Sequence, residues 1–257
     1  MFTCNLSAYN MEFLTNVVHS EDFRTARCVA SNKKTNILSN LTKACVTCVR
    51  EKCVTSKAIV QKVVRLTMAE ADSYLERDPA VRIIHLVRDP RGILLSRMHF
   101  NSKTSGEMHN NYSYICQRIR DDIKVSREIS HKHWGKILTL RYEDMAQDLL
   151  RATEIMYSFT GLEMLPSVRS YVRKVTSYEA VLPNGKTAAK QTARKNPFKT
   201  AYNWRLELPF SLVKLVDHAC KDVLDNMGYL TFTSEEKLRD MSQPAKLENY
   251  GYGLMTV

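Results

Sequence analysis

The sequence predicts an α/β fold: a single domain with a parallel sheet flanked by helices. Three short runs rich in β-branched and aliphatic residues predict strands, at 58–64, 81–87 and 136–142. Apolar residues recur at helical spacing in four other stretches, at 66–77, 90–98, 112–130 and 149–159. Strands that alternate with helices are typical of parallel sheets, because each crossover to the next parallel strand needs a connection of that length.

Composition agrees with a folded domain that binds anions. The chain has 257 residues, of which 44% are hydrophobic and 25% charged, which is ordinary for a globular protein with a sizeable core. It carries 38 Lys and Arg against 27 Asp and Glu, a formal net charge of +11. Such a balance favours a polyanionic partner, namely a nucleotide, a sulfated glycan, nucleic acid or an anionic membrane, and does not choose among them.

Residues 1–56 are expected to form an irregular, cysteine-rich segment ahead of the domain at 57–230. Five of the seven cysteines lie in the first 53 residues. A zinc site would need a fourth ligand beside Cys45, Cys48 and Cys53, and the sequence has none there, so we expect disulfides, with one cysteine left over. That indicates an oxidising compartment. Sequons at Asn5, Asn40 and Asn111 agree weakly with a lumenal glycoprotein.

Targeting signals are not evident in the sequence. No run reaches the 18 or so apolar residues that a membrane span requires, and the first ten residues lack the basic and apolar regions of a signal peptide. The sequence therefore predicts no membrane span and shows no route into the secretory pathway. The number of cysteines, in contrast, indicates an oxidising compartment.

The stretch 81–100 organises the rest of the chain. Val81 to Val87 predicts a buried strand, and helical spacing resumes directly after Pro90. Asp89 is suited to cap that helix and Pro90 to its first turn, where a missing N–H costs nothing. Arg88 places a positive charge beside free backbone N–H groups, so this turn is a candidate phosphate site. A plain βα unit with a surface ion pair would show the same pattern.

Several residues and segments outside this stretch are expected to have structural roles. Glu143 and Asp144 follow the strand at 136–142, and we expect them to cap the next helix rather than act as bases. His85, in mid-strand, is expected to be a core or hydrogen-bonded histidine. Residues 208–227 predict one more amphipathic helix, and 231–257 a polar, poorly ordered tail.

The segment HLVRDPRGILLSR resembles the 3′-phosphate-binding segment of sulfotransferases, in which an arginine and a serine eight residues later grip the donor 3′-phosphoadenosine 5′-phosphosulfate (PAPS). Its sequence is most similar to that of the Golgi carbohydrate 6-O-sulfotransferases. The run RYEDMAQDLLRATEIMYSFTGL at 141–162 is similar to the same family. The resemblance implies a sulfotransferase variant of the P-loop nucleotide-kinase-like fold, a Golgi location, and Arg88, Arg91 and Ser96 as donor-binding residues.

Two further site residues come from the same resemblance. Lys62, at the end of the first predicted strand, is similar to a strand-end lysine that would stabilise charge on the sulfonate; a solvated lysine is the alternative. The basic stretch 186–199 resembles a loop that closes over the 3′-phosphate, which implies Arg194 and Lys195 as candidate donor-binding residues. A basic surface loop is the alternative there.

One departure from the family pattern limits these expectations. The basic, Gly- and Ser-rich loop that binds the 5′-phosphosulfate, and the strand before it, do not precede Lys62, so the fold is predicted to be N-terminally incomplete. The resemblance implies PAPS-dependent transfer of a sulfonyl group to a sugar hydroxyl without a metal. We expect this chain to bind the nucleotide and transfer sulfonate slowly, as a fragment would.

Two other functions are alternatives to this one. A non-catalytic protein that binds polyanions or nucleotides would keep the phosphate site without the sulfonate loop. A nucleotide-dependent kinase is disfavoured because the sequence contains no G-x-x-x-x-G-K-[ST] motif. The expected partners are thus a nucleotide donor and a glycan acceptor, and not a nucleic acid.

Overall fold

The computed structural model describes residues 50–51, 53–64, 66–100, 111–176 and 197–248. The chain divides into two compact units, Met1–Arg65 and Leu66–Val257. In the first unit, residues 53–55 are helical and 56–64 have no regular secondary structure. The prediction of a strand at 58–64 is therefore wrong. Its β-branched side chains are exposed, Val60 by 87% and Val64 by 83%. β-branched residues favour a strand mainly when they pack against neighbours, and these side chains do not.

The second unit follows the predicted order of elements closely. Its helices and strands are α4 (Met68–Arg77), β1 (Ile83–Val87), α5 (Pro90–Phe100), α6 (Tyr112–Lys132), β2 (Ile137–Arg141), α7 (Tyr142–Gln147), α8 (Leu149–Thr160), α9 (Pro166–Thr176), α10 (Pro197–Tyr202), α11 (Trp204–Glu207), α12 (Phe210–Ala219), α13 (Lys221–Met227) and α14 (Glu235–Arg239). Two of the three predicted strands are confirmed, and so are the four predicted helices that precede residue 160.

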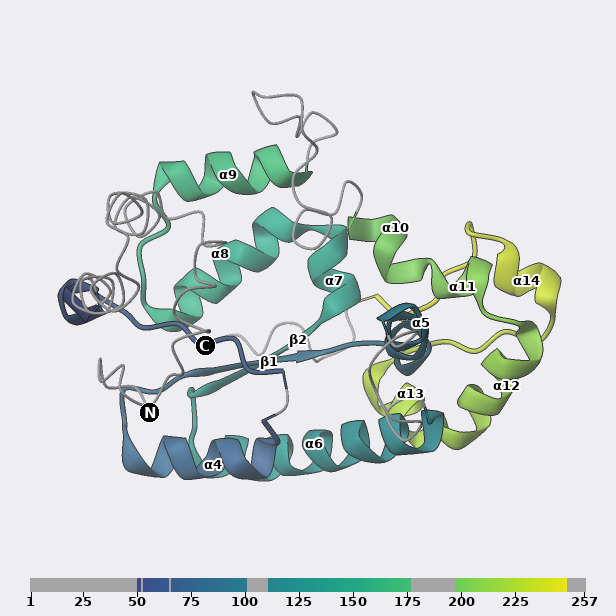
Figure 1. The fold of residues 1–257 in the computed structure, drawn as a ribbon, viewed down its shortest axis with the longest axis horizontal. Helices are drawn as coiled ribbons and strands as arrows, with labels where there is room; N and C mark the ends of the chain where they lie inside the picture. The colour runs from purple at the N-terminus through teal and green to yellow at the C-terminus, as the bar shows by residue number, and fades with distance from the viewer. Residues whose placement is uncertain (1–49, 52, 65, 101–110, 177–196, 249–257) are drawn as a thin grey trace, which may run out of the picture. The chain divides into compact units, whose positions relative to one another are not determined.

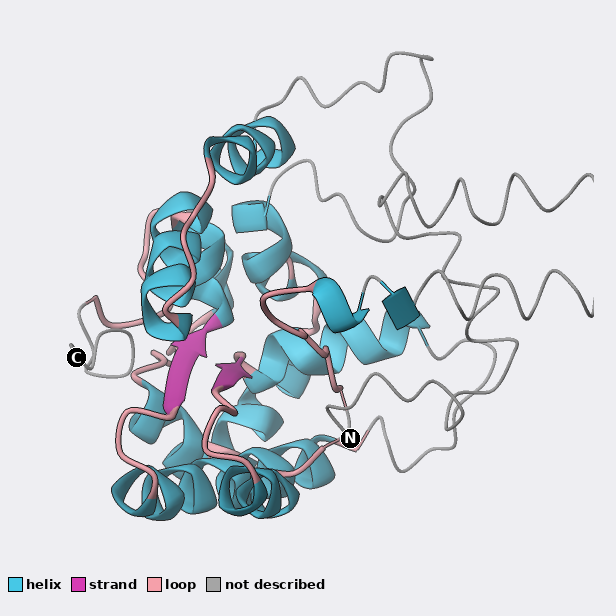
Figure 2. Ribbon diagram, turned by 90° about the vertical axis from the view of Figure 1, so that its left-hand side faces the viewer, coloured by secondary structure: helices cyan, strands magenta, loops and turns pink. Residues whose placement is uncertain are grey.

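The two described strands form a parallel pair, which confirms the α/β class. Their register runs from Ile83 opposite Ile137 to Val87 opposite Arg141. Helices α4 and α6 lie along one side of the strands, and α7 and α8 along the other (Figures 1 and 2). Because both strands run the same way, the residues after Val87 and after Arg141 meet at one edge of the sheet. That edge carries the candidate site.

The two faces of strand β1 are not equally covered. Val87 is buried, whereas Ile84 and Leu86 are 38% and 48% exposed. Successive side chains of a strand point to opposite faces, so the helices that cover Ile83 and Val87 leave the alternate residues open. The prediction of a fully buried strand is correct for one face only.

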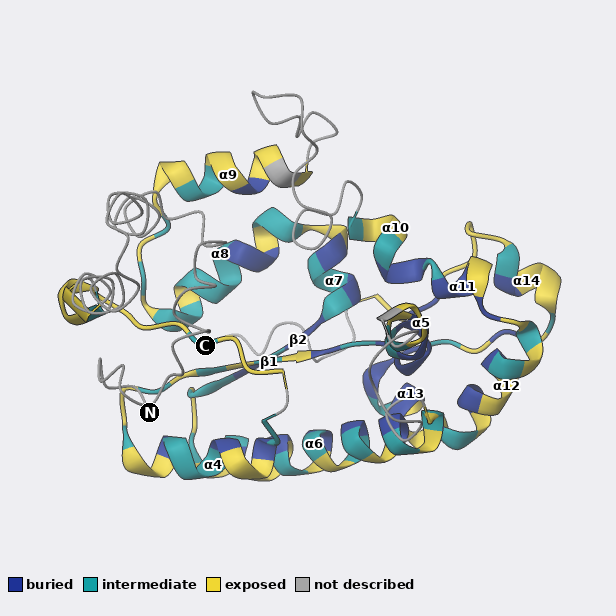
Figure 3. Cartoon of the chain, viewed as in Figure 1, coloured by how far each residue is buried: buried dark blue, intermediate teal, exposed yellow. Residues whose placement is uncertain are grey.

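The core joins the α5 region to helices from the end of the chain. One cluster of buried residues includes Val87, Leu94, Ile119, Val216 and Leu224. Helix α6 contributes the predicted stripe, with Ile115, Ile119, Ile123 and Ile129 all buried. Figure 3 shows this burial concentrated around α5, α11 and α13, while α9 is mostly exposed. The packing holds α5, and the turn before it, rigidly in place.

The C-terminal part differs from its prediction in two ways. The single helix expected at 208–227 is two helices, α12 and α13, that break at Cys220. Cys220 forms a disulfide with Cys116 of α6. The predicted disordered tail is also wrong for 231–248, because Phe232, Leu238 and Ala245 are buried there. A mostly polar segment can pack against the domain through a few apolar side chains when each of them is buried.

Several predictions lie outside the described residues or concern absences. Cys4, Cys28, Cys45 and Cys48 are among the undescribed residues, so their expected disulfides stay a prediction. No helix in the described ranges combines the length and the apolar character that crossing a membrane requires. Within the same ranges, no group of three or more His, Cys, Asp or Glu side chains could hold a metal ion.

Candidate functional site

The candidate site begins at the turn between β1 and α5. As predicted, Asp89 caps the helix: its carboxylate accepts the N–H of Arg91 at 2.9 Å, and its carbonyl accepts that of Ile93 at 3.0 Å. Pro90 occupies the first helical position. The helix N-terminus is therefore fixed at the end of a strand, with Arg88 directly before it.

Two contacts hold the Arg88 side chain in one orientation. Its guanidinium lies over the ring of Tyr142, 4.6 Å from the centroid. One terminal nitrogen donates to the Thr200 carbonyl at 3.2 Å. The Nε of Arg88 is buried and has no hydrogen-bond partner among the described residues. A buried donor without a partner is costly, so the turn holds one hydrogen-bond donor that no described acceptor satisfies.

Gly92 gives Arg88 the room it occupies. A Cβ added at Gly92 would lie 3.1 Å from the Nε of Arg88 and 3.4 Å from Cδ1 of Trp204. A side chain at this position would force the guanidinium to shift by a few tenths of an ångström. Ser96 is exposed one turn later on α5. Gly92 and Ser96 are four residues apart within α5, so they share a helix face, and Arg88 lies against Gly92 from the turn before the helix.

Arg91 has a different role from the one its sequence position suggested. Its side chain is 0% exposed, and it pairs with Asp89 at 2.7 Å and with Asp217 at 3.0 Å. A further N–H donates to the Leu230 carbonyl, and the guanidinium stacks on Trp204. Burial alone would lower the pKa of Arg91, but the two carboxylates raise it. Arg91 is a structural cation, and no face of it is open to a donor nucleotide.

Glu143 does not cap the helix after β2, contrary to expectation. Helix α7 begins at Tyr142, and Asp148 caps the following helix α8 by accepting the Arg151 N–H at 2.9 Å. Glu143 instead is fully buried and accepts the backbone N–H of Asp89 at 3.2 Å and the Tyr229 hydroxyl at 2.7 Å. Burial, together with the charge of Asp89, raises the pKa of Glu143 to about 7.

The other carboxylate and the strand histidine are structural. Asp144 pairs with Arg141 and Lys246, at 2.6 Å and 2.9 Å, so it also does not cap the following helix. His85 is partly buried, and burial lowers its pKa. Its Nδ1 has no partner within the described ranges, which fits a largely apolar setting rather than the expected hydrogen bond. We therefore do not assign Asp144 or His85 as a general base.

The assignments of Lys62, Arg194 and Lys195 stay predictions. Lys62 is exposed in the irregular stretch of the first unit, while Arg88 and Ser96 belong to the second. Arg194 and Lys195 lie outside the described residues. The assembled site is thus the Arg88 turn, with Gly92 and Ser96 beside it.

Two supporting residues were not foreseen from the sequence. Val87 pairs with Arg141, so Tyr142 follows β2 just as Arg88 follows β1, and strand register could have placed the two side by side. The carbonyl of Thr200 comes from a residue 112 positions away and carries no sequence signal.

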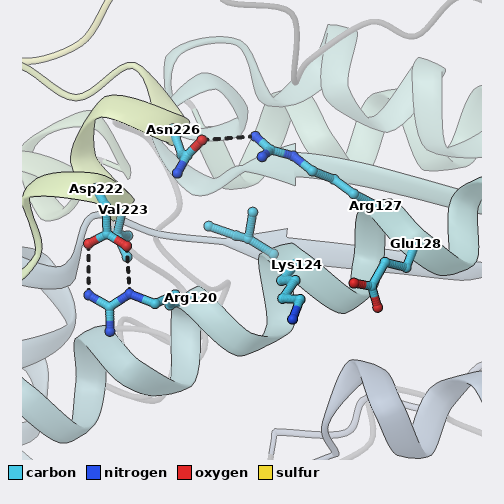
Figure 4. A pocket seen from close by; sticks show the side chains of 8 residues that line it. Arg120, Lys124, Arg127, Glu128, Asp222, Val223 and Asn226 are labelled. Atoms are coloured by element: carbon cyan, nitrogen blue, oxygen red, sulfur yellow. Dashed lines mark hydrogen bonds and ion pairs between the residues drawn. The ribbon is translucent and has the colours of Figure 1, made fainter.

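A separate cavity of about 310 Å³ lies between α6 and α13 (Figure 4). Its two arginines are already engaged: Arg120 with Asp222, and Arg127 with Asn226 at 3.2 Å. None of its lining residues belongs to the Arg88 turn. We therefore do not place the candidate site there.

Comparisons with known proteins found one family profile and several curated relatives. A profile of the sulfotransferase domain matches residues 11–240. Carbohydrate sulfotransferase 1 of Rattus norvegicus is 31% identical over 221 residues, which cover 79% of this chain and 51% of that protein. Carbohydrate sulfotransferase 6 of Homo sapiens is 27% identical over 217 residues, which cover 76% of this chain and 54% of that protein.

Carbohydrate sulfotransferase 3 of Mus musculus is 30% identical over 204 residues, which cover 72% of this chain and 42% of that protein. The chain thus spans about half the length of the curated relatives that it matches. No solved structure matches the chain significantly.

Proposed function

The chain belongs to the sulfotransferase family, and from that premise we propose that the protein transfers a sulfonyl group from PAPS to a sugar hydroxyl of a glycan, at the 6-position. The observation that carries the proposal is the Arg88 guanidinium, fixed between Tyr142 and Gly92 with a buried Nε that lacks a partner in the described chain. The names of the relatives, all carbohydrate sulfotransferases, support a sugar acceptor.

In this proposal the Arg88 turn holds the 3′-phosphate of the donor. Arg88 donates charge-assisted hydrogen bonds to the phosphate oxygens, and Ser96 adds a hydroxyl from the next turn of α5. Tyr142 and the Thr200 carbonyl keep the guanidinium oriented, so little side-chain freedom is lost on binding. When bound, the donor supplies the activated sulfonyl group, and adenosine 3′,5′-bisphosphate is left after transfer.

Lys62 and Arg194 complete the proposed site. Lys62 would place a cation where negative charge develops on the sulfonate, and Arg194 would add a second cation to the 3′-phosphate. Positioning and cations dominate transfers of this kind, so the proposal assigns no covalent nucleophile. The proposed location is the Golgi, where glycan acceptors are assembled. The basic balance of the chain, +11, suits both an anionic donor and a sulfated product.

A transfer assay tests the proposal. Donor carrying radiolabelled sulfate is incubated with glycans that end in galactose, N-acetylglucosamine or N-acetylgalactosamine. A version extended by its upstream coding sequence is run in parallel, because the present chain alone is expected to transfer slowly. Losing preorganised donors around the sulfonate costs about 10²- to 10³-fold in rate for each one.

The expected result is labelled sugar, substituted at the 6-hydroxyl, from the extended version and less of it from the present chain. Labelled sugar from neither version would contradict the proposal. If both then still bound nucleotide, a non-catalytic binding protein would be the better description.

A further inference from the structure

Glu143 supports the backbone that carries Arg88. The peptide N–H of Asp89, which Glu143 accepts at 3.2 Å, belongs to the bond that joins Arg88 to Asp89. The second carboxylate oxygen is held by the Tyr229 hydroxyl at 2.7 Å. Glu143 therefore ties the strand-to-helix turn to α7 and to the segment after α13. We propose that Glu143 is a positioning residue of the donor site, and that donor binding is linked to the proton it carries.

Charged and titratable groups surround Glu143 and influence whether its carboxyl group is protonated. Asp89 of the turn and Asp144 of α7 are negative, Arg141 of β2 is positive, and Tyr202 of α10 and Tyr229 are titratable groups influenced by the same carboxylates. Arg91 is occupied with Asp89 and Asp217 and does not neutralise Glu143. A carboxyl group that is wholly buried and has no cation bonded to it gains or loses its proton near neutral pH.

The sign of the linkage follows from the charges. A phosphate at Arg88 adds negative charge near Glu143, so it is repelled less when Glu143 is protonated. Bound donor should therefore raise the pKa of Glu143 further. Because linkage is reciprocal, protonation should tighten donor binding, and affinity should rise as the pH falls through the range in which Glu143 titrates.

The test uses adenosine 3′,5′-bisphosphate as the probe and so rests on the proposed function. Its affinity is measured by calorimetry from about pH 6 to about pH 8 for the wild type and for Glu143→Gln. A glutamine can accept the Asp89 N–H and donate to the Tyr229 oxygen, so it keeps both hydrogen bonds without a titrating group. The phosphate of the probe also titrates, but equally in both proteins, so the ratio of the two affinities isolates Glu143.

Two further variants separate positioning from stability. Glu143→Ala removes both hydrogen bonds and should weaken the probe by about two- to tenfold at low pH, where the charge is already absent. Asp144→Asn is the matched control, because it removes a neighbouring carboxylate with no contact to Asp89. Thermal unfolding of every variant confirms that folded protein is being compared.

The expected result is a ratio of wild-type to Glu143→Gln affinity that falls about fivefold as the pH rises across this range, most of the roughly tenfold effect of a one-unit coupling. The Asp144→Asn variant should keep the pH dependence of the wild type, moved to lower pH, because it removes one of the negative charges around Glu143. Parallel pH profiles for the wild type and Glu143→Gln would overturn the inference while leaving the donor site intact. Absence of binding by the wild type at every pH would instead overturn the donor site itself, and the inference with it.

Discussion

Replacing both Cys116 and Cys220 with alanine should lower the free energy of unfolding by about 2 to 5 kcal/mol. The two cysteines are buried in the main core and are 104 residues apart in sequence. A cross-link that closes so long a loop removes much of the freedom of the unfolded chain, about 4.7 kcal/mol for a loop of 100 residues. The disulfide ties α6 to the break between α12 and α13, so its loss should loosen the packing behind α5.

Urea unfolding, with and without a reductant, measures this effect. Reduction should shift the midpoint of the wild type strongly. It should shift that of the double variant much less, because only cysteines elsewhere remain to be reduced. If the oxidised wild type and the double variant unfolded at the same urea concentration, the disulfide would contribute nothing to stability.

Replacing Arg91 with alanine should cost about 3 to 5 kcal/mol of stability, comparable to the loss of the disulfide. Arg91 is completely buried, and both of its carboxylate partners, Asp89 and Asp217, are buried with it. Removing the cation leaves two negative charges in the interior without compensation. Because Asp89 also caps α5, the disturbance should reach the turn that carries Arg88.

The matched control for this prediction is Arg120→Ala. Arg120 also pairs with an aspartate, Asp222, but the two side chains are 36% and 46% exposed. Exposed pairs are worth at most about 1 kcal/mol, so this variant should unfold almost like the wild type. Equal losses in the two variants, measured by urea unfolding, would show that the Arg91 cluster is not the buried support described here.

Local signals in the sequence were sufficient for most of the framework. The change from strand to helix at Arg88 could be predicted because capping by Asp89 and the position of Pro90 depend on neighbouring residues alone. The side shared by Gly92 and Ser96 follows from helix geometry. Wherever local pattern and tertiary packing agree, as in α6, the prediction and the structure also agree.

Long-range contacts account for what the sequence could not show. The helix break at Cys220 coincides with its disulfide to α6, a partner that spacing alone does not identify. Arg91 looks like a second donor-binding cation until Asp217, from a distant helix, is seen to claim it. Glu143 looks like a cap until Tyr229 and Asp89 are seen to bury it. Residues 58–64 have high β propensity, but their side chains are exposed and do not pack against another element as those of a strand would.

The central claim is that the Arg88 turn binds the 3′-phosphate of the donor, and calorimetry with two nucleotides tests it most directly. Adenosine 3′,5′-bisphosphate carries that phosphate, and adenosine 5′-phosphate lacks it. Arg88→Ala is compared with the wild type and with Arg82→Ala, which removes an exposed arginine from the opposite end of β1. All three proteins are titrated with both nucleotides.

We predict that Arg88→Ala weakens the bisphosphate by about ten- to a hundredfold, the worth of a charge-assisted contact of roughly 1.5 to 3 kcal/mol. Adenosine 5′-phosphate should bind the wild type and Arg88→Ala alike, and Arg82→Ala should change neither affinity. Unchanged affinity of Arg88→Ala for the bisphosphate, or an equal loss for both nucleotides, would contradict the account.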